Sequence, residues 1–251
     1  MQIDLNGKIA IVTGAAGQLG RTMARTLAAC GADVVIHYHR SADVANELVN
    51  EIQAMGRRAA ALSADITDET SVNALRDAAV AALGWPDIVV DNAVSQYKWT
   101  TVLEQSGADF EDQFRSCVMQ NVWMAKAFIP HMQQAGWGRF VGINTECSLL
   151  HLPGQAAYAS AKSGMDGLLK ILAREVAASG VTVNEVAPGW TISDRERNQG
   201  IADSTEYLKS VPMGRRGTDQ EIANVVAFLA SELASYVTGV LIPVCGGRVL
   251  R

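Results

Sequence analysis

The sequence has few of the features that mark secreted, membrane-spanning or metal-binding proteins. Its 251 residues include only 4 cysteines and 4 histidines, with no C-x-x-C pair and no metal-like spacing, so we expect free thiols and no metal site. No apolar run reaches spanning length, and the amino terminus lacks the basic and apolar regions of a secretory signal. We therefore expect a soluble, cytoplasmic protein with no membrane partner.

Positive charge is also scarce. Lys and Arg total 21 against 26 Asp and Glu, which gives a net charge of -5, so the chain offers no basic surface for a nucleic acid backbone. Pro-rich linkers, internal repeats and low-complexity tracts are missing from the sequence as well. With 49% hydrophobic residues available for a core, we expect residues 1–251 to form a single domain.

What the sequence does contain is an alternation of short β-branched runs and longer Ala-rich segments with helical period. This pattern predicts an α/β fold of the Rossmann type, a doubly wound parallel sheet of about seven strands with helices on both faces. A glycine follows each of the first five helices closely, as is typical of helix ends. The predicted strands are 9–12, 33–37, 59–63, 87–90, 139–143, 181–186 and 240–244, and the predicted helices are 19–30, 42–55, 68–83, 110–134, 156–179 and 219–231.

Residues 190–213 follow the sixth predicted strand and carry no clear helical or strand period. Ligands bind at the carboxyl ends of parallel strands, so we expect this segment to be a mobile lid over the substrate. A surface helix between two loops is the alternative.

A glycine-rich turn joins the first strand to the first helix, with the sequence TGAAGQLG over residues 13–20. The backbone N–H groups of such a turn can approach a pyrophosphate at the amino end of the helix. A turn that only packs the strand against the helix is the alternative. We expect a dinucleotide to contact Gly14, Gly17, Gln18, Leu19 and Gly20.

The end of the second strand indicates which dinucleotide binds. A site that prefers NAD(H) normally has an acid here for the ribose hydroxyls, and residues 37–41 contain none. His39, Arg40 and Ser41 are suited to a 2'-phosphate instead, Arg40 through charge-assisted hydrogen bonds. We predict NADP(H) in preference to NAD(H), with Arg40 as a solvated surface residue as the alternative.

A tyrosine and a lysine stand four residues apart at Tyr158 and Lys162, and therefore on one face of a helix. The pair alone is weak evidence, since it can arise by chance. Two further residues strengthen it, because Thr145 lies thirteen positions upstream at a strand end and Asn121 lies in the preceding long helix.

Together these motifs resemble the short-chain dehydrogenase/reductase family, and in particular its 3-oxoacyl-(acyl-carrier-protein) reductase-like members. The family patterns T-G-x-x-x-G-x-G, N-N-A-G, Y-x-x-x-K and V-N-x-x-x-P-G recur here in order. The resemblance runs from about Leu5 to Gly247 and implies an oxidoreductase that interconverts a carbonyl and an alcohol, assembled as a homotetramer or, second, a dimer. This chain departs from the patterns at Gln18, Asp91, Val94 and Thr145, where Thr145 replaces a serine.

The resemblance also implies further cofactor contacts after the third, fourth and sixth strands. For Asp65, a helix-capping or turn role is an equal alternative to contact with adenine. The implied contacts are Asp65, Ile66, Asn92, Ala93, Val94, Pro188 and Gly189, together with Tyr158 and Lys162.

The family's tetrad implies a role for each of four residues. A carbonyl oxygen that gains negative charge needs a proton, which Tyr158 gives, while the charge of Lys162 favours the phenolate and its ammonium binds the nicotinamide ribose. Thr145 orients the substrate oxygen, and Asn121 holds a water that relays protons. The structural alternatives are a packed Tyr158, a solvated Lys162, a locally bonded Asn121 and an ordinary strand-end Thr145.

The substrate pocket is expected to contain Thr145, His151 and Trp190. Glu146, Cys147 and His151 have no partner at a diagnostic spacing, and we interpret them as structural or pocket-lining. A catalytically silent NAD(P)-sensing binding protein of the same fold is the competing function. Such sensors usually lose the tyrosine or the lysine, so the presence of both favours an enzyme.

Overall fold

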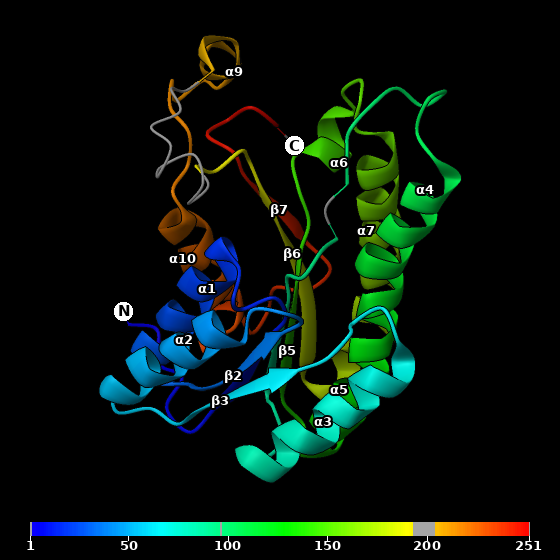
Figure 1. Cartoon of the computed structure of the whole chain (residues 1–251). Coiled ribbons are helices and arrows are strands. Elements are labelled where there is room, and N and C mark those ends of the chain that lie inside the picture. The colour runs from blue at the N-terminus through cyan, green and yellow to red at the C-terminus, as the bar shows by residue number, and fades with distance from the viewer. Residues whose placement is uncertain (1, 96, 193–203, 251) are drawn as a thin grey trace.

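The β-branched runs form one fully parallel sheet with the strand order β3-β2-β1-β4-β5-β6-β7 (Figure 1). The computed structural model describes residues 2–95, 97–192 and 204–250. The predicted Rossmann-type class is confirmed, and every predicted strand is placed to within two residues at each end. The strands are β1 (Ile9–Val12), β2 (Asp33–Tyr38), β3 (Ala59–Ser63), β4 (Ile88–Asp91), β5 (Gly138–Ile143), β6 (Val181–Pro188) and β7 (Leu241–Val244).

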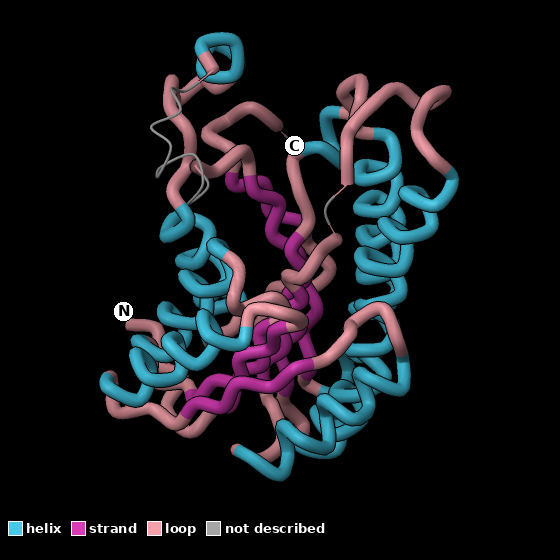
Figure 2. The backbone as a smooth tube through the Cα atoms, in the orientation of Figure 1, coloured by secondary structure: helices cyan, strands magenta, loops and turns pink. Residues whose placement is uncertain are grey.

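Helices cover both faces of the sheet, as the tube in Figure 2 shows. Neighbouring residues of one strand point to opposite faces, so Val12 packs in the core under one helical layer and Ile11 in the core under the other. Both faces are therefore apolar, which is why these strands are continuous hydrophobic runs. One layer contains α1 (Gln18–Ala29), α2 (Ala42–Ala54) and α10 (Asp219–Leu229), and the other contains α3 (Glu69–Ala82), α5 (Gln120–Ala135) and α7 (Ala156–Val176).

Short elements complete the described part of the chain. The five glycines predicted to end helices all have positive φ, between 69° and 109°, as the left-handed helix end requires. No helix of the described residues is long and apolar enough to cross a membrane. The short elements are α4 (Gly107–Phe114), α6 (Cys147–Leu150), α9 (Thr205–Ser210), and the 3-10 turns η2 (Ala177–Ser179) and η3 (Glu232–Ala234).

Residues 107–135 are helical throughout, as predicted for 110–134, but the middle is a π-helical turn, η1 (Arg115–Met119), between α4 and α5. Two side-chain amides bond carbonyls of this turn: Nε2 of Gln120 donates to the Ser116 carbonyl at 3.0 Å, and Nδ2 of Asn121 donates to the Cys117 carbonyl at 2.7 Å. These amides bond carbonyls four residues back, the positions that backbone N–H groups bond in a regular α-helix.

The predicted lid, 190–213, is only partly described, since residues 193–203 lie outside the described residues. Its later part contains α9, whose amino end is capped by the Ser204 hydroxyl. In Figure 1 this helix stands beyond the carboxyl ends of the strands. β1 lies between β2 and β4, so the connections that leave β1 and β4 diverge to opposite faces and open a crevice at this edge.

Candidate active site

Two adjoining cavities occupy the carboxyl edge of the sheet. The larger, which we call the long cleft, has a volume of about 1040 Å³, and the smaller, the side cavity, has about 660 Å³. Every residue predicted to contact a cofactor lines the long cleft. The cleft is lined by Gly14, 16–20, 37–41, 65–67, 92–95, Asp112, 143–145, Tyr158, Lys162, Pro188 and Gly189.

The glycine-rich turn at the start of α1 leaves room for an anion. A Cβ on Gly20 would lie 2.3 Å from the Gly14 carbonyl oxygen, so the turn folds tightly against the helix start. Gly17 caps α1 without a side-chain hydrogen bond, and the first turn carries no acid. The helix amino end thus offers backbone donors to the cleft, and the residues present fit the pyrophosphate of a dinucleotide.

His37, which the sequence analysis did not single out, holds this turn in place. The Gly14 N–H donates to Nδ1 of His37 at 3.0 Å, and Nε2 lies 3.1 Å from the Ala64 carbonyl oxygen. Burial lowers the pKa of His37 to about 4. The ring is therefore neutral, accepts at Nδ1 and donates at Nε2. A histidine at a fully buried strand position was the signal available in the sequence.

The end of the cleft beside the carboxyl end of β2 is lined by the exposed residues His39, Arg40 and Ser41, with no acid among residues 37–41. The carboxylate of Asp65 accepts from the backbone N–H of Thr67 at 2.8 Å and from its hydroxyl at 2.6 Å. Hydrogen bonding by Thr67 holds the pKa of Asp65 below its usual range. Asp65 thus has the turn role that the sequence analysis gave as one alternative. It also lines the cleft, as the other alternative, contact with a cofactor, requires.

Thr13 ties the turn after β1 to the chain after β4. Its hydroxyl donates to Oδ1 of Asp91 at 2.8 Å and accepts from the backbone N–H groups of Asn92 and Ala93 at 2.8 and 3.0 Å. The side chain of Asn92 donates to the Thr13 carbonyl at 2.9 Å. Asp91 is fully buried, which raises its pKa to about 7. These bonds fix two walls of the long cleft relative to each other.

The predicted catalytic residues Thr145, Tyr158 and Lys162 come together where the long cleft meets the side cavity. Thr145 follows β5, and the other two lie in the first turns of α7. Nζ of Lys162 donates to the Ile143 carbonyl at 2.5 Å and lies 6.0 Å from the Tyr158 ring centroid. Tyr158 and Thr145 line both cavities, so a molecule in either one reaches them.

The sequence predicted that the charge of Lys162 favours the phenolate of Tyr158, whereas the pKa of this residue is raised. Burial raises this pKa above its usual value, and only a hydrogen bond with Thr145 opposes the shift among its leading causes. Lys162 is not among the leading causes of this shift, and its Nζ donates to the Ile143 carbonyl. The phenol is therefore protonated at neutral pH, the form that donates a proton.

Asn121 lines neither the long cleft nor the side cavity. It is fully buried, and its amide nitrogen donates to the Cys117 carbonyl. This local hydrogen bond is the one that the sequence analysis gave as the structural alternative for Asn121. Oδ1 has no hydrogen-bond partner among the described residues. Of the four tetrad residues, Asn121 therefore lies behind the other three.

Asn144, a second residue that the sequence analysis did not single out, connects the catalytic elements. Oδ1 accepts from the Thr145 N–H and the Ser148 hydroxyl, both at 2.8 Å. Nδ2 donates to the Lys162 carbonyl at 3.1 Å and to Oε2 of Glu185 at 2.5 Å. Burial raises the pKa of Glu185 to about 8. All four hydrogen-bonding positions of the Asn144 amide are thus occupied, which fixes the loop after β5 on α7.

Aromatic side chains form much of the side cavity, which is lined by Tyr97, Trp99, Trp190 and Tyr207 among others. The Trp99 ring stacks against Tyr158 with a centroid distance of 6.2 Å. Trp190 lines this cavity, in agreement with its predicted place in the substrate pocket. His151 lines neither cavity: it is exposed and ends α6 with φ of 52°, so the geometry does not support its predicted place in the pocket.

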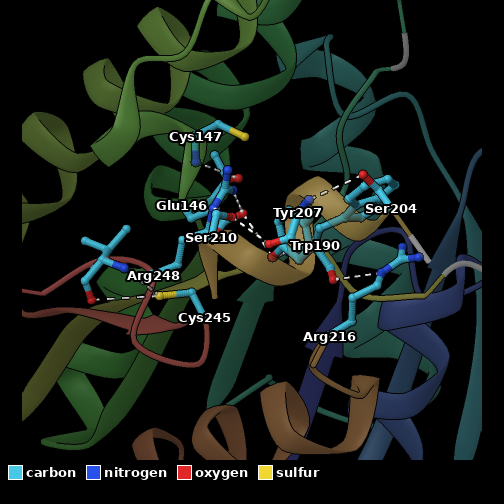
Figure 3. A network of polar contacts seen from close by, with 11 residues as sticks. Glu146, Cys147, Trp190, Ser204, Tyr207, Ser210, Arg216, Cys245 and Arg248 are labelled. Atoms are coloured by element: carbon cyan, nitrogen blue, oxygen red, sulfur yellow. Dashed lines mark hydrogen bonds and ion pairs between the residues drawn. The ribbon is translucent and has the colours of Figure 1, made fainter. Parts of the chain in front are cut away.

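A charged network closes the far side of this cavity (Figure 3). Nη1 of Arg248 lies 2.5 Å from Oε1 of Glu146. The hydroxyl of Tyr207 donates to the same oxygen at 3.2 Å and accepts from the Trp190 N–H at 2.7 Å. Arg216 stacks on Trp190 at 4.1 Å and donates to the carbonyls of Trp190 and Thr191. The network joins the loop after β5, the loop after β6, α9 and the carboxyl-terminal segment.

Known proteins share both the sequence and the fold. A family model described as enoyl-(acyl carrier protein) reductase matches residues 14–248. The 3-oxoacyl-(acyl-carrier-protein) reductase FabG of Pseudomonas aeruginosa is 37% identical over 248 residues, which cover 99% of this chain and 100% of that protein. The chain belongs to the short-chain dehydrogenase/reductase family. It is an NAD(P)-dependent oxidoreductase that acts on CH–OH and C=O groups.

Solved structures of other short-chain dehydrogenases/reductases superpose closely on this chain. A 7 alpha-hydroxysteroid dehydrogenase complexed with NADH and 7-oxo glycochenodeoxycholic acid has a TM-score of 0.90 and 32% identity, covering 100% of this chain and 97% of that one. A gluconate 5-dehydrogenase from Burkholderia cenocepacia in complex with NADP and tartrate has a TM-score of 0.91 and 29% identity, covering 98% and 97%. Both cofactors thus occur on this fold.

Proposed function

We propose that this protein is an NADP(H)-preferring oxidoreductase that interconverts a carbonyl and an alcohol, with Tyr158 as the general acid and base. The observation that carries the proposal is the position of Tyr158, which lines both the long cleft and the side cavity. A cofactor in the first and a substrate in the second both reach its hydroxyl. The family relationship supports the reaction type.

The residues at this junction have separate tasks. A bound nicotinamide supplies or accepts the hydride. During reduction, negative charge develops on the substrate oxygen, and the protonated Tyr158 donates to that oxygen. The Thr145 hydroxyl oxygen accepts from the Cys147 N–H at 3.2 Å and the hydroxyl also bonds Tyr158, which holds Thr145 beside the substrate oxygen. Lys162, buried at the cleft floor, offers its ammonium to the nicotinamide ribose.

Replacing the proton donor tests this role. Tyr158→Phe keeps the ring and its contact with Trp99 but removes the hydroxyl, so we expect kcat to fall about 10³-fold. Cofactor affinity, measured by quenching of tryptophan fluorescence, should stay within about 2-fold, because the cleft keeps its other contacts. A variant that keeps near-normal turnover would refute the role.

The cofactor preference rests on His39, Arg40 and Ser41, which line the cleft where an acid would favour NAD(H). We expect KM for NADPH to be at least about ten-fold below KM for NADH, and Arg40→Ala to reduce that difference by raising KM for NADPH alone. The matched control is Arg57→Ala, since Arg57 lies away from the cleft beside Gly31. A ten-fold preference for NADH would overturn this part of the proposal.

Three further features are proposed on the same basis. The chain forms one NAD(P)-binding catalytic domain, residues 190–213 act as a substrate lid, and four copies assemble through α5, α7 and β7, as family members commonly do. The lid proposal gains support from Trp190 and Tyr207, which lie in that segment and line the side cavity. The predicted cytoplasmic location stays a prediction.

A further inference from the structure

Glu146 and Arg248 form a charged pair in the wall of the side cavity, away from the cofactor. Both residues line this cavity and neither lines the long cleft. Only 4% of the Glu146 side chain and 15% of the Arg248 side chain are exposed. Glu146 directly follows Thr145 in the chain, and Thr145 lines the same cavity, so the pair lies next to the proposed reaction centre.

The pair has one acceptor and one donor that the described residues leave without a partner. Oε1 of Glu146 accepts from Arg248 and Tyr207, whereas Oε2 is buried and has no hydrogen-bond partner in the described part of the chain. Arg248 donates from Nη1 to Glu146 and from Nε to Ser210 at 2.8 Å. Among the described residues, no bond is found for its Nη2.

Arg248 is also fixed in orientation. Its guanidinium carbon lies 4.6 Å from the Tyr207 ring centroid, so the planar group stacks on the ring while two of its nitrogens are bonded. A preorganised donor of this kind loses little conformational freedom when it bonds a ligand.

The chemistry of these two atoms selects among the carbonyl compounds that the family reduces. A hydroxyl group donates and accepts, and so matches a carboxylate that is paired with a guanidinium. A carboxylate only accepts and would face the negative Glu146, while the opposite charges of the pair leave no net attraction for an anion. An unsubstituted alkyl chain would leave both polar atoms unpaired.

We propose that Glu146 and Arg248 recognise a hydroxyl group of the substrate, which makes hydroxylated ketones and the corresponding polyols the substrate class. This inference rests on the proposed function. In the reduction, a hydride from the reduced cofactor forms the new C–H bond, and the proton of Tyr158 completes the alcohol. Glu146 and Arg248 hold the second hydroxyl and exchange no electrons.

A matched series of six-carbon ketones tests the wild-type protein with NADPH. The probes are 2-hexanone, its monohydroxy derivatives at each free position, fructose, and 5-oxohexanoate. We expect at least one hydroxylated ketone to exceed 2-hexanone and 5-oxohexanoate in kcat/KM by about 100-fold, because a site that bonds a hydroxyl discriminates strongly against an analogue without one. This comparison needs no variant and so does not depend on the folding of one.

Two variants then connect that preference to the pair. We expect Glu146→Gln and Arg248→Ala each to raise KM for the preferred hydroxyketone at least about ten-fold, and to reduce its advantage in kcat/KM over 2-hexanone by about the same factor. The control is Glu69→Gln, which changes an exposed pair with Lys126 at 3.2 Å and should alter neither substrate.

The outcomes separate this inference from the proposed function. If 2-hexanone matches the hydroxyketones, or 5-oxohexanoate exceeds them and depends on Arg248, the hydroxyl site is wrong and the carbonyl reductase remains. If the variants reduce all ketones equally, the pair does not recognise a hydroxyl. If no ketone of the series is reduced, the hydroxyl site is wrong, and a β-ketoacyl thioester then tests the proposed function by itself: turnover keeps the carbonyl reductase, and no turnover overturns it.

Discussion

Glu185 shows how a single buried acid makes the stability of this fold depend on pH. It lies in β6 with 2% of its surface exposed, and the groups that face it are Asn144, directly after β5, and Asp166 and Lys162 on α7. Burial raises its pKa from 4.5 to about 8. At neutral pH the folded protein therefore keeps a proton that the unfolded chain has released.

The sign of the resulting pH dependence follows from that proton. The stability associated with protonated Glu185 is fully present below pH 4.5 and is lost as the pH rises toward about 8. Across this window the free energy of unfolding falls by about 1.4 kcal/mol per pH unit for this group. Asp91, with its pKa raised to about 7, adds a decrease of the same sign.

We expect Glu185→Gln to remove the Glu185 part of that decrease, since an amide cannot ionise. Urea unfolding at pH 5, 6, 7 and 8 should give a shallower decline than in wild type, with Asp91 accounting for the rest. Glu69→Gln, at a half-exposed site, is the matched control and should parallel wild type. Parallel curves for Glu185→Gln and wild type would show that Glu185 is already ionised in the folded protein.

The sequence indicated the proposed catalytic residues better than the residues that support them. Tyr158, Lys162 and Thr145 were predicted because their chemistry and their spacing belong together, and the structure brings them together. His37 and Asn144 have no such spacing: each acts through partners distant in the chain, such as Gly14 and Glu185. Which buried polar groups meet depends on strand order and packing, so only the folded structure identifies them.

At the scale of elements, the start of α1 depends on the absence of one side chain. A Cβ on Gly20 would lie 2.3 Å from the Gly14 carbonyl oxygen, a distance that forces the turn to move. We expect Gly20→Ala to lower the free energy of unfolding by about 1–3 kcal/mol and to weaken NADPH binding at least ten-fold, as measured by fluorescence titration.

Gly56→Ala is the control for Gly20→Ala, because it introduces backbone strain without pushing any neighbouring atom away. Gly56 has φ of 80°, but nothing lies within 4 Å of a Cβ placed there. This variant should lose about 1 kcal/mol of stability and keep its NADPH affinity. Equal effects of the two variants on binding would mean that the turn at Gly20 has no special part in holding the cofactor.

Helix ends were predictable because they depend on local signals, whereas the π-helical turn inside a helix was not. Glycines marked the ends of five helices correctly, because the left-handed conformation is a property of that residue. The π-helical turn between α4 and α5 carries no glycine or proline. The amides of Gln120 and Asn121 bond its carbonyls, and Gln120 also donates to the Ala93 carbonyl at 3.0 Å, a contact that no sequence period reveals.

For the whole molecule, the exposed apolar side of α5 and α7 bears on the proposed tetramer. A groove of about 350 Å³ between these helices is lined mostly by apolar side chains, with Lys126, Gln133 and Glu175 among its polar ones, and Ile171 in its lining is 59% exposed. We expect light scattering to give a mass about four times the 26.8 kDa of one chain and Ile171→Glu to lower it, because a buried charge at an interface is costly.

The matched control for that change is Met55→Glu, since Met55 is 46% exposed after α2, away from α5 and α7. It should leave the mass unchanged. A monomeric wild type, or an unaffected mass for Ile171→Glu, would exclude these helices as the main interface.

The two cavities share part of their walls, and this has a consequence for the order of events in turnover. Gln18, Ser95, Thr145, Tyr158 and Gly189 line both spaces. A cofactor in the long cleft therefore supplies a surface that the substrate contacts, and a substrate already seated obstructs its entry. We expect compulsory-order kinetics, in which NADPH binds first and NADP leaves last, so that NADP inhibits competitively against NADPH and noncompetitively against the ketone.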